Sequence, residues 1–403
     1  MKSSKNASII FIFITVMVDM IGIGIIFPVM PDLIKNITGG TIGEASFYSG
    51  ILATTYAVLQ FIFAPILGEL SDKYGRKPVL LIALFGLGID YLFFAFAPTL
   101  IWLFIGRVIA GIAGASHTVA SAYIADISSK EDKAKNFGIM GAAFGLGFII
   151  GPTIGGLFSE LGVHVPFFVA AGITLLNFLF GLFFVPESLN TENRREIDYQ
   201  RMIPGKSLLR LTSYPFGSLL LVFFLVSLAG MALPLTWAYF TIESYSWTRI
   251  EVGVSLSIIG LLVAIVQAGL IRWFQKKFGT KKTILIGLSL LTIGMLLFAI
   301  AFNETLLYLF LIPYALGGIT GPTIQGVISN NVSDKEQGNL QGVITSLTSI
   351  STIISPLIYP IIFYSFTKEG NTYFPGAPYL VAGIILLIAV ILAIKSIDKV
   401  KIT

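Results

Sequence analysis

The sequence predicts an all-α membrane protein with twelve transmembrane helices. Of its 403 residues, 55% are hydrophobic and only 12% are charged, and the mean hydropathy is +0.89. A soluble globular domain carries roughly 25% charged residues, so this chain has too little charge to cover a water-exposed surface. Its apolar runs are roughly 20 residues long, the length that a helix needs to cross ~30 Å of hydrocarbon at 1.5 Å per residue.

The apolar runs form two groups of six, separated by a polar segment. The first six are expected near residues 8–33, 45–68, 78–97, 99–125, 136–159 and 165–185. The other six are expected near residues 214–242, 250–274, 281–302, 304–329, 339–366 and 376–396. We therefore predict an N-terminal six-helix bundle at 1–188, a cytoplasmic linker at 189–212 and a C-terminal six-helix bundle at 213–403.

Basic residues predict the orientation in the membrane. Most of the 26 Lys and Arg residues fall in loops on one face, whereas Lys35, Arg249 and Lys368 fall on the other. The positive-inside rule places the basic face, and with it both termini, in the cytoplasm. The net charge of +5 is thus an insertion signal and not a nucleic-acid surface. The absence of cysteine excludes disulfides and thiolate metal sites.

The two halves of the chain repeat weakly. Gly75–Ile82 aligns with Gly279–Ile286. At the same offset three further pairs match: Gly114 with Gly318, Gly138 with Gly342, and Pro152 with Pro356. A duplicated helical unit is typical of secondary transporters, whose substrate site lies near the midplane between the repeats.

Ionisable residues inside the predicted spans are candidates for function. Asp19 and Asp90 lie near the middle of spans one and three, and Arg107 lies in span four. A carboxylate at the bilayer centre costs at least ~2.5 kcal/mol. Burial disfavours its charged form and a nearby cation favours it, so such a group can gain and lose a proton. Asp19, Asp90 and Arg107 are therefore candidates for proton coupling; the alternative is that a carboxylate only pairs with Arg107 and locks the bundle.

The remaining polar groups of the spans are candidates for substrate contact or for packing. His117 does not share a helix face with Arg107, which is ten residues earlier. It is either a hydrogen-bonded packing residue or a substrate contact. The C-terminal half offers uncharged polar and aromatic groups: Trp237, Tyr239, Gln267, Tyr314, Gln325 and Asn330. We hypothesise that the N-terminal half binds and releases protons and that the C-terminal half binds the substrate.

Two motifs indicate moving or closely packed parts. The loop Gly68–Lys77 contains Asp72 and Arg76, which can pair reversibly with helix ends such as Asp126. This predicts a cytoplasmic latch; the alternative is an ordinary basic loop. In span five, Gly147, Gly151 and Gly155 recur every four residues around Pro152, a spacing that lets helices approach closely in lipid. The glycine run is not a nucleotide-binding loop, because no strand precedes it.

Together these motifs resemble the major facilitator superfamily, and within it the drug:proton antiporters of the tetracycline-exporter type. The resemblance runs nearly end to end, and is carried by Asp19–Gly24, Gly68–Lys77, Gly106–Gly111, Ala122–Ile127, Gly147–Gly156, Pro186–Ser188, Gly317–Gly318, Gln325 and Gln337–Gly342. It implies the major facilitator fold, in which twelve helices form two pseudo-symmetric six-helix bundles.

The resemblance also implies roles for residues. Asp19, Asp90 and Arg107 would be essential membrane charges. The cavity candidates would be Gln60, Asn177 and Trp237, to which the residues themselves add His117, Gln267 and Gln325. The gate would comprise Gly68, Asp72, Arg76 and Asp126, with Gly147, Gly151 and Pro152 in span five.

The implied activity is transport, without enzyme chemistry and without a bound cofactor or metal of the protein's own. Such exporters lie in the bacterial inner membrane and exchange a metal-chelated, cationic tetracycline for a proton. The expected partners are therefore a small amphipathic molecule, protons and the lipid bilayer, with no nucleic acid.

Two departures from the family pattern bear on the substrate. Where the tetracycline exporters carry a histidine in span eight and an aspartate in span nine, this chain has Val263 and Leu291. His117 also replaces a small residue. A different or broader drug range follows as an expectation.

The other functions considered are a proton symporter that imports a small metabolite, a membrane-embedded enzyme and a passive channel. The sequence has no paired catalytic groups for the enzyme and no polar rings for the channel.

Overall fold

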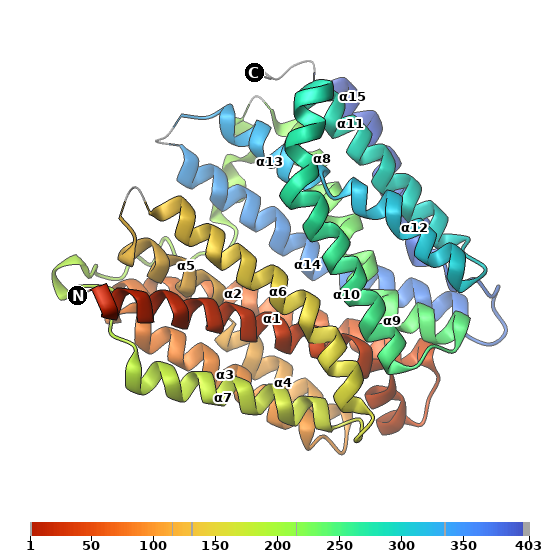
Figure 1. Cartoon of the computed structure of the whole chain (residues 1–403), viewed down its shortest axis with the longest axis horizontal. Helices are drawn as coiled ribbons and strands as arrows, with labels where there is room; N and C mark the ends of the chain where they lie inside the picture. Colours follow the sequence, from red (N-terminus) through yellow and green to blue (C-terminus); the bar gives the residue numbers. More distant parts are fainter. Residues whose placement is uncertain (1, 115, 130–131, 215, 334–335, 398–403) are drawn as a thin grey trace. The chain divides into compact units, whose positions relative to one another are not determined.

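The computed structural model describes residues 2–114, 116–129, 132–214, 216–333 and 336–397, and it contains helices but no strand in these ranges (Figure 1). The helices of the first half are α1 (Lys2–Thr38), α2 (Ile42–Tyr74), α3 (Arg76–Ala95), α4 (Leu100–Ala113), α5 (Ser116–Ile127), α6 (Lys133–Ser159) and α7 (Val165–Phe184). The polar segment after α7 contains the 3₁₀ turns η1 (Thr191–Asn193) and η2 (Lys206–Ser213). The helices of the second half are α8 (Gly217–Gly230), α9 (Ala232–Tyr245), α10 (Arg249–Ile265), the π-helical turn η3 (Val266–Leu270), α11 (Ile271–Ala299), α12 (Glu304–Gly317), α13 (Thr320–Asn330), α14 (Gln337–Thr367) and α15 (Ala377–Ile397).

The number of membrane spans agrees with the prediction. The described residues contain eleven helical stretches that are long and apolar enough to cross a bilayer. One of them, Arg249–Ala299, has 51 residues, far more than the roughly 20 that one crossing needs. Its helical dihedrals are interrupted at Gly279, where φ is 76° and ψ is 161°. This stretch therefore holds two spans, and the total of twelve is confirmed.

Gly75 and Gly279 show why the repeat keeps a glycine at this place. Gly75 separates α2 from α3 and Gly279 separates the two spans of Arg249–Ala299, and both have a positive φ, of 113° and 76°. Residues with a Cβ rarely adopt such dihedrals. Glycine therefore allows the same sharp turn between consecutive spans in both halves.

Spans four and ten, predicted as continuous, are each made of two helices. The first break lies after α4, at Gly114, and the second lies after α12, at Gly318. The sequence repeat aligns these two glycines. Interrupted helices at corresponding positions of two repeats are typical of transporter binding sites, because the break frees backbone groups inside the membrane. Span seven is also divided, at Met231, and span eight contains η3.

The chain divides into two compact units, each described here by itself. Unit 1 comprises Met1–Thr41, Leu52–Pro204 and Thr248–Ser257, and unit 2 comprises Ile42–Ile51, Gly205–Trp247 and Ile258–Thr403. Each unit thus includes a short piece of helix from the other half of the sequence. The bundle boundaries 1–188 and 213–403 remain a prediction about the halves of the chain.

The core of unit 1 forms around α1. Phe11, Ile12 and Val16 of this helix are buried against apolar side chains of α3 and α5. On another face, Gly147, Gly151 and Gly155 of α6 lie directly against the α1 backbone, near Met17, Ile21 and Ile25 respectively. The close approach of two helices that the four-residue glycine spacing predicts is present, and it needs the absence of side chains at these positions.

Substitution of Gly151 by alanine is expected to destabilise the protein. A Cβ at Gly151 would lie 2.6 Å from the carbonyl oxygen of Ile21 and 2.9 Å from Cα of Gly24, so the two backbones would have to separate. Overpacking of this kind costs about 1–3 kcal/mol, which a lower Tm of the purified protein would report. Gly145→Ala on the same helix is the control, since its Cβ would meet no described atom within 4 Å. Equal Tm values for the two variants would contradict the prediction.

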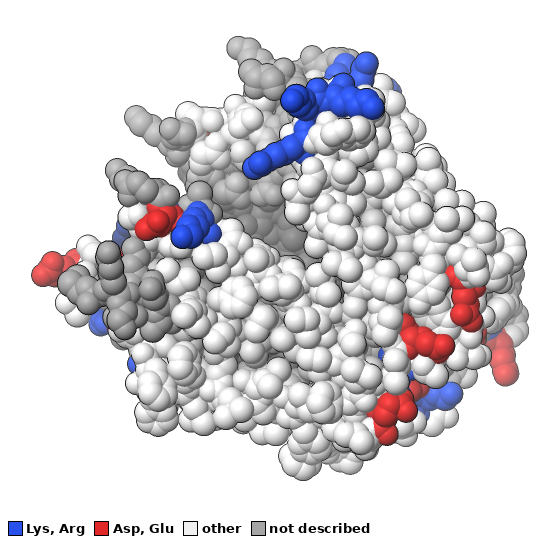
Figure 2. All heavy atoms as spheres, viewed as in Figure 1, with Lys and Arg blue, Asp and Glu red and all other residues white. Residues whose placement is uncertain are grey.

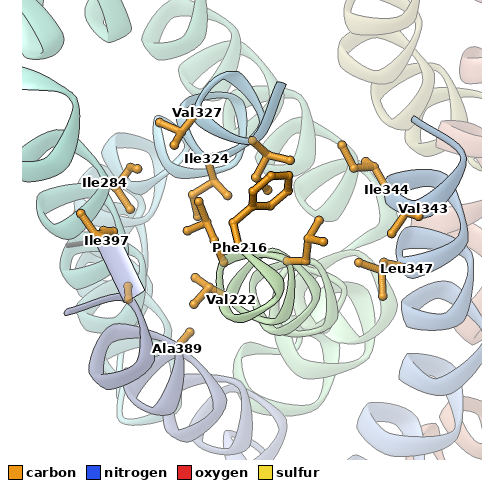
Figure 3. Packing of buried hydrophobic residues seen from close by; sticks show 14 of the residues in the cluster. Phe216, Val222, Ile284, Ile324, Val327, Val343, Ile344, Leu347, Ala389 and Ile397 are labelled. Carbon is orange, nitrogen blue, oxygen red and sulfur yellow. The ribbon is translucent and has the colours of Figure 1, made fainter. Parts of the chain in front are cut away.

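The core of unit 2 is apolar and well packed. Phe216, at the start of α8, lies among Ile324 of α13 and Ile344 and Leu347 of α14 (Figure 3). Residues of α11 and α15 complete the cluster, which contains only hydrophobic side chains. Such packing holds these helices as one body.

The charged residues of unit 2 are divided between its two ends. On the face drawn in Figure 2, one group of charged residues holds Lys and Arg and lies near the start of α11, and a second group, near α9 and α12, is mostly Asp and Glu with some Lys or Arg beside them. The exposed basic side chains include those of Arg272, Lys276, Lys277 and Lys282 of α11. This asymmetry is the one that the positive-inside rule describes, and the assignment of the basic end to the cytoplasm remains a prediction.

Candidate functional site

Asp90 and Arg107 form a buried ion pair between α3 and α4. Asp90 is fully buried, and the side chain of Arg107 is 12% exposed. The Arg107 Nε donates to Oδ1 of Asp90 at 3.2 Å, and its Nη2 contacts Oδ2. The guanidinium also lies 4.6 Å from the ring centre of Phe94. A two-pronged pair of this geometry is strong and directional, so Arg107 is the counter-ion of Asp90.

Gly106 makes room for this pair. A Cβ at Gly106 would lie 2.6 Å from Oδ1 of Asp90. Gly106 therefore leaves the space that the Asp90 carboxylate occupies, and the next residue, Arg107, supplies the guanidinium that binds this carboxylate. This gives a physical reason for the first glycine of the Gly106–Gly111 motif.

Asp19 lies in a different environment from Asp90. It is 5% exposed on α1, and its side chain has a hydrogen bond with Ser116 at the start of α5. Its Oδ1 has no hydrogen-bond partner among the described residues. The structure thus settles which carboxylate pairs with Arg107: it is Asp90. Asp19 is left as a buried carboxyl group that can change its charge without breaking an ion pair.

Gln60 connects α2 to the break in span four. Its Nε2 donates to the carbonyl oxygen of Gly114 at 2.9 Å and lies 3.0 Å from the hydroxyl of Tyr56. The ring centre of Tyr56 lies 5.5 Å from the Arg107 guanidinium. Gln60 therefore binds the backbone group that the helix break exposes, and joins it to the surroundings of the Asp90–Arg107 pair.

Several residues around Asp19 and the Asp90–Arg107 pair were not predicted. The rings of Tyr56 and Phe94 lie beside the Arg107 guanidinium, Ser116 lies beside Asp19, and Tyr91 packs against α1. Only the structure identifies them. For Tyr56 a signal existed, because it precedes Gln60 by four residues and so lies on the same helix face. For the others, the sequence does not determine which side of the helix faces Asp19.

His117 and Asn177 lie in contrasting surroundings. His117 is exposed on unit 1, with its ring 6.2 Å from that of Phe144 of α6. Asn177 is 4% exposed, and its Nδ2 donates to the hydroxyl of Thr15 at 2.9 Å, which ties α7 to α1. His117 is thus exposed at the surface of unit 1, whereas Asn177 is packed between helices.

The three candidates of the C-terminal half do not share one environment. Trp237 is 1% exposed and packs edge-on against Phe298 and Tyr379, with ring centres 5.3 Å and 6.4 Å away. Gln267 is exposed in the π-helical turn η3, and Gln325 is half-buried on α13. A π-helical turn inside a helix is frequent at functional sites, a feature that the sequence did not predict.

Val263 and Leu291 lie in apolar contacts of unit 2. Val263 packs against the cluster of Val266, Ala315 and Ile319. Leu291 is 8% exposed, and a Cβ at Gly317 would lie 2.7 Å from its Cα. These two positions therefore pack the break of span ten and supply no ionisable group there.

Arg76 joins three segments at one end of unit 1. Its Nε donates to Asp126 of α5 at 3.1 Å, and its Nη1 donates to the hydroxyl of Ser71 at 2.7 Å and contacts the carboxylate of Asp72. The pairing of Arg76 with Asp126 that the loop motif predicts is present, and Arg76 also pairs with Asp72, which was not predicted. Gly68 lies one turn earlier on α2 and accepts a hydrogen bond from Ser71 at 2.7 Å.

Glu187 completes this network, and its part in it was not predicted. Its carboxylate accepts hydrogen bonds from the backbone N–H groups of Arg76 at 2.8 Å and of Lys77 at 3.1 Å. These are unsatisfied donors of the first turn of α3, where a negative charge is favourable. The carboxylate thus holds the start of α3 and the segment that follows α7 together.

Replacement of Arg76 by lysine is expected to slow transport about tenfold, equivalent to ~1.4 kcal/mol. An ammonium group keeps the charge but has no planar fork, so it cannot hold Asp72 and Asp126 at the same time. Initial rates of substrate efflux from loaded cells measure the effect. The control is Lys73→Arg, because Lys73 is exposed and its ammonium lies over the ring of the adjacent Tyr74. An Arg76→Lys rate equal to that of the control would refute the latch.

The comparisons with known proteins decide the family. The model of the Major Facilitator Superfamily matches residues 12–276 and 219–401, which together span nearly the whole chain. The chain belongs to the major facilitator superfamily. The resemblance that the motifs indicate and the twelve-helix fold are thereby confirmed.

Relatives within this superfamily are drug-resistance proteins. The chain is 40% identical over 348 residues to the tetracycline resistance protein, class C, of Escherichia coli, covering 86% of this chain and 87% of that one. It is 36% identical over 342 residues to the class B protein of Escherichia coli, covering 85% of each chain. It is 26% identical over 408 residues to multidrug resistance protein 2 of Bacillus subtilis (strain 168), covering 96% and 95%.

Solved structures agree on the fold. A bacterial homologue of the human lysosomal transporter Spinster, in an inward-facing and occupied conformation, superposes with a TM-score of 0.81 at 15% identity, over 99% of this chain and 98% of that one. The human organic anion transporter MFSD10 gives a TM-score of 0.70 at 20% identity, over 96% and 99%. The protein is thus a multi-pass membrane transporter with the major facilitator fold.

Proposed function

We propose that this protein exports small amphipathic drugs in exchange for protons, by alternating access, in the manner of the tetracycline exporters. The observation that carries the proposal is Asp19, a buried membrane carboxyl group that has no ion pair with any residue the structure describes. The tetracycline resistance proteins to which the chain is 36–40% identical support the drug as its cargo.

In this mechanism the two membrane carboxylates have different tasks. Asp90 stays ionised against Arg107 and holds α3 to α4. Asp19 takes up a proton from one side of the membrane and releases it to the other. Because an uncompensated charge is expensive in a low dielectric, each change of charge at Asp19 shifts the balance between conformations. Drug and proton are coupled because both bind with different affinity to these conformations.

The substrate contacts are proposed from accessibility. His117 and Gln267 are exposed on their units, and Gln60 and Gln325 are half-buried, so these four side chains are available to a drug. Asn177 and Trp237 are packed among neighbouring side chains, and we assign them to the support of the cavity walls.

Val263 and Leu291 bear on the range of drugs. The apolar side chains at these two positions offer no ligand for the metal of a tetracycline chelate. We propose a broader range, in which uncomplexed amphipathic drugs are carried as well as tetracyclines. The identity to multidrug resistance protein 2 of Bacillus subtilis (strain 168) fits such a range.

The cellular arrangement follows from the same proposal. The protein lies in the inner membrane of a bacterium with both termini in the cytoplasm, since the basic loops favour that side. The energy comes from the proton gradient, without a bound cofactor. Import of a metabolite by proton symport has less support, because the relatives named above are resistance proteins.

Drug accumulation in bacteria that express the protein tests this proposal. Cells are loaded with tetracyclines and with ethidium, with and without a protonophore, and compared with cells that carry the empty vector. Expression is expected to lower accumulation, and the protonophore is expected to restore it. Low accumulation that persists in the presence of the protonophore would reject proton coupling, and unchanged accumulation of every drug would reject export.

A further inference from the structure

Four buried side-chain polar atoms of unit 1 lack a hydrogen-bond partner among the described residues: the hydroxyl of Thr174, Oδ1 of Asn177, and the two that matter here, Oδ1 of Asp19 and the hydroxyl of Tyr91. Asp19 is 5% exposed and Tyr91 is fully buried. An unpaired buried donor or acceptor is unfavourable. The atoms of Asp19 and Tyr91, one a possible acceptor and the other a donor, indicate a hydrogen bond that forms in another state of the protein.

The two atoms lie at the same stretch of α1, one on this helix and one packed against it. The Tyr91 hydroxyl of α3 lies so close to Gly22 that a Cβ on this glycine would overlap it. Gly22 follows Asp19 by three residues, so both lie on the same face of the helix. The absence of a side chain at Gly22 therefore brings the phenol to within one helical turn of the carboxyl group.

The other ionisable groups around this place have other partners or face elsewhere. Arg107 of α4 is held by Asp90, and Tyr56 of α2 faces Gln60 and Arg107. The spans of α6 after Asn136 and of α7 contain no ionisable side chain.

Four further ionisable residues on α1 and α5 are engaged as follows: Asp32 pairs with Arg249, His117 lies against Phe144, Tyr123 donates to Pro186, and Asp126 pairs with Arg76. Tyr91 is thus a donor that packs against the Asp19 stretch of α1 and has no hydrogen-bond partner among the described residues.

We propose that Tyr91 is a positioning residue for proton exchange at Asp19. When the Asp19 proton leaves to water, the phenol donates a hydrogen bond to the carboxylate and keeps its own proton. When the carboxyl group is protonated again, the bond opens, as in this structure. The reason is that a charged carboxylate gains more from a donor than a neutral carboxyl group does. This inference rests on the proton coupling of the proposed function, but not on the identity of the drug.

The change in charge at Asp19 would thereby become a change in the contact between α1 and α3. With the proton on Asp19, the two helices meet at Gly22 through van der Waals contact alone. With the proton gone, a directional bond links them. A change in the protonation of Asp19 would thus alter the contacts of α3, the helix that also carries Asp90.

Infrared difference spectroscopy of the full-length protein in lipid tests the inference without any drug. The C=O stretching band of protonated carboxyl groups is followed against pH, and the part that is missing in Asp19→Asn belongs to Asp19. The midpoint is then measured in Tyr91→Phe and in Gly22→Ala, in which the added methyl group displaces the phenol. The control is Tyr359→Phe, which removes a buried hydroxyl that donates to Leu228 at 3.1 Å in unit 2.

Tyr91→Phe is expected to raise the midpoint of the Asp19 band by about one pH unit, equivalent to ~1.4 kcal/mol. The sign follows because the variant removes a donor to the ionised form only, so the proton stays bound to a higher pH. Gly22→Ala should shift the midpoint in the same direction, and Tyr359→Phe should leave it in place. If Tyr91→Phe does not fold, as judged by size-exclusion chromatography, the midpoint of the Asp19 band in Gly22→Ala decides the test.

An unchanged or lower midpoint in the folded Tyr91 variant would overturn the inference, as would the absence of any Asp19 band in the unmodified protein. A shifted midpoint together with cells that retain every drug would support the role of Tyr91 and reject the drug export. The two proposals therefore fail separately.

Discussion

Asp19→Asn is expected to abolish proton-driven export. The amide has the shape of the carboxyl group, so the packing of α1 around it, 5% exposed, should persist. It cannot bind or release a proton, and removal of a proton-transferring side chain typically costs at least about a hundredfold in rate. Uptake of drug into everted membrane vesicles, driven by an imposed pH gradient, measures the loss.

Counterflow separates this effect from a general loss of transport. Exchange of labelled for unlabelled drug at equal pH needs the conformational change but no net proton movement. We expect Asp19→Asn to keep this exchange while the gradient-driven uptake falls to the level of vesicles that lack the protein. Gradient-driven uptake at the unmodified rate in Asp19→Asn would remove Asp19 from the mechanism.

Arg107→Ala is expected to destabilise the fold severely. The substitution leaves the fully buried carboxylate of Asp90 without its cation and opens a space beside Phe94, 4.6 Å from the lost guanidinium. Loss of one partner of a buried pair costs about 3–5 kcal/mol, a large share of the 5–15 kcal/mol by which proteins are stable. Thermal unfolding and the yield of monodisperse protein report it.

The double variant Asp90→Asn/Arg107→Gln is the matched control. It replaces two charges with two amides that can bond to each other, so no charge is left unpaired. We expect its Tm to lie well above that of Arg107→Ala, because the penalty comes from the isolated carboxylate and not from the loss of the pair itself. A Tm as low as that of Arg107→Ala would show that the guanidinium is needed for its packing on Phe94.

The candidate site was predictable in part. The membrane charges Asp19, Asp90 and Arg107 could be found from the sequence, because charged residues are rare in apolar runs and stand out at once. The pairing of the loop residue Arg76 with Asp126 could also be predicted. The roles of Tyr91 and Glu187 could not. A tyrosine is common in membrane helices, and a glutamate in a loop is common everywhere, so neither type of residue marks a site until its neighbours are known.

The repeat of Gly114 with Gly318 is an intermediate case. The sequence alignment pairs the two glycines, yet it does not tell that each ends a helix in the middle of a span. Glycine in a membrane helix is as often a packing residue, as Gly147 and Gly151 are in α6. The difference lies in the backbone dihedrals and in the partner that Gln60 supplies to the freed carbonyl group.

The sequence by itself determined that this protein crosses a membrane twelve times and belongs to a duplicated transporter fold. Length and hydropathy decide this locally, because each span must bury its own backbone hydrogen bonds in lipid. Only the tertiary structure decided that Arg107 pairs with Asp90 and leaves Asp19 without a cation, and that Trp237 is packed while Gln267 is exposed. Those outcomes depend on how each helix is rotated against its neighbours, and this rotation is set by packing along the whole contact and not by the residues of one span.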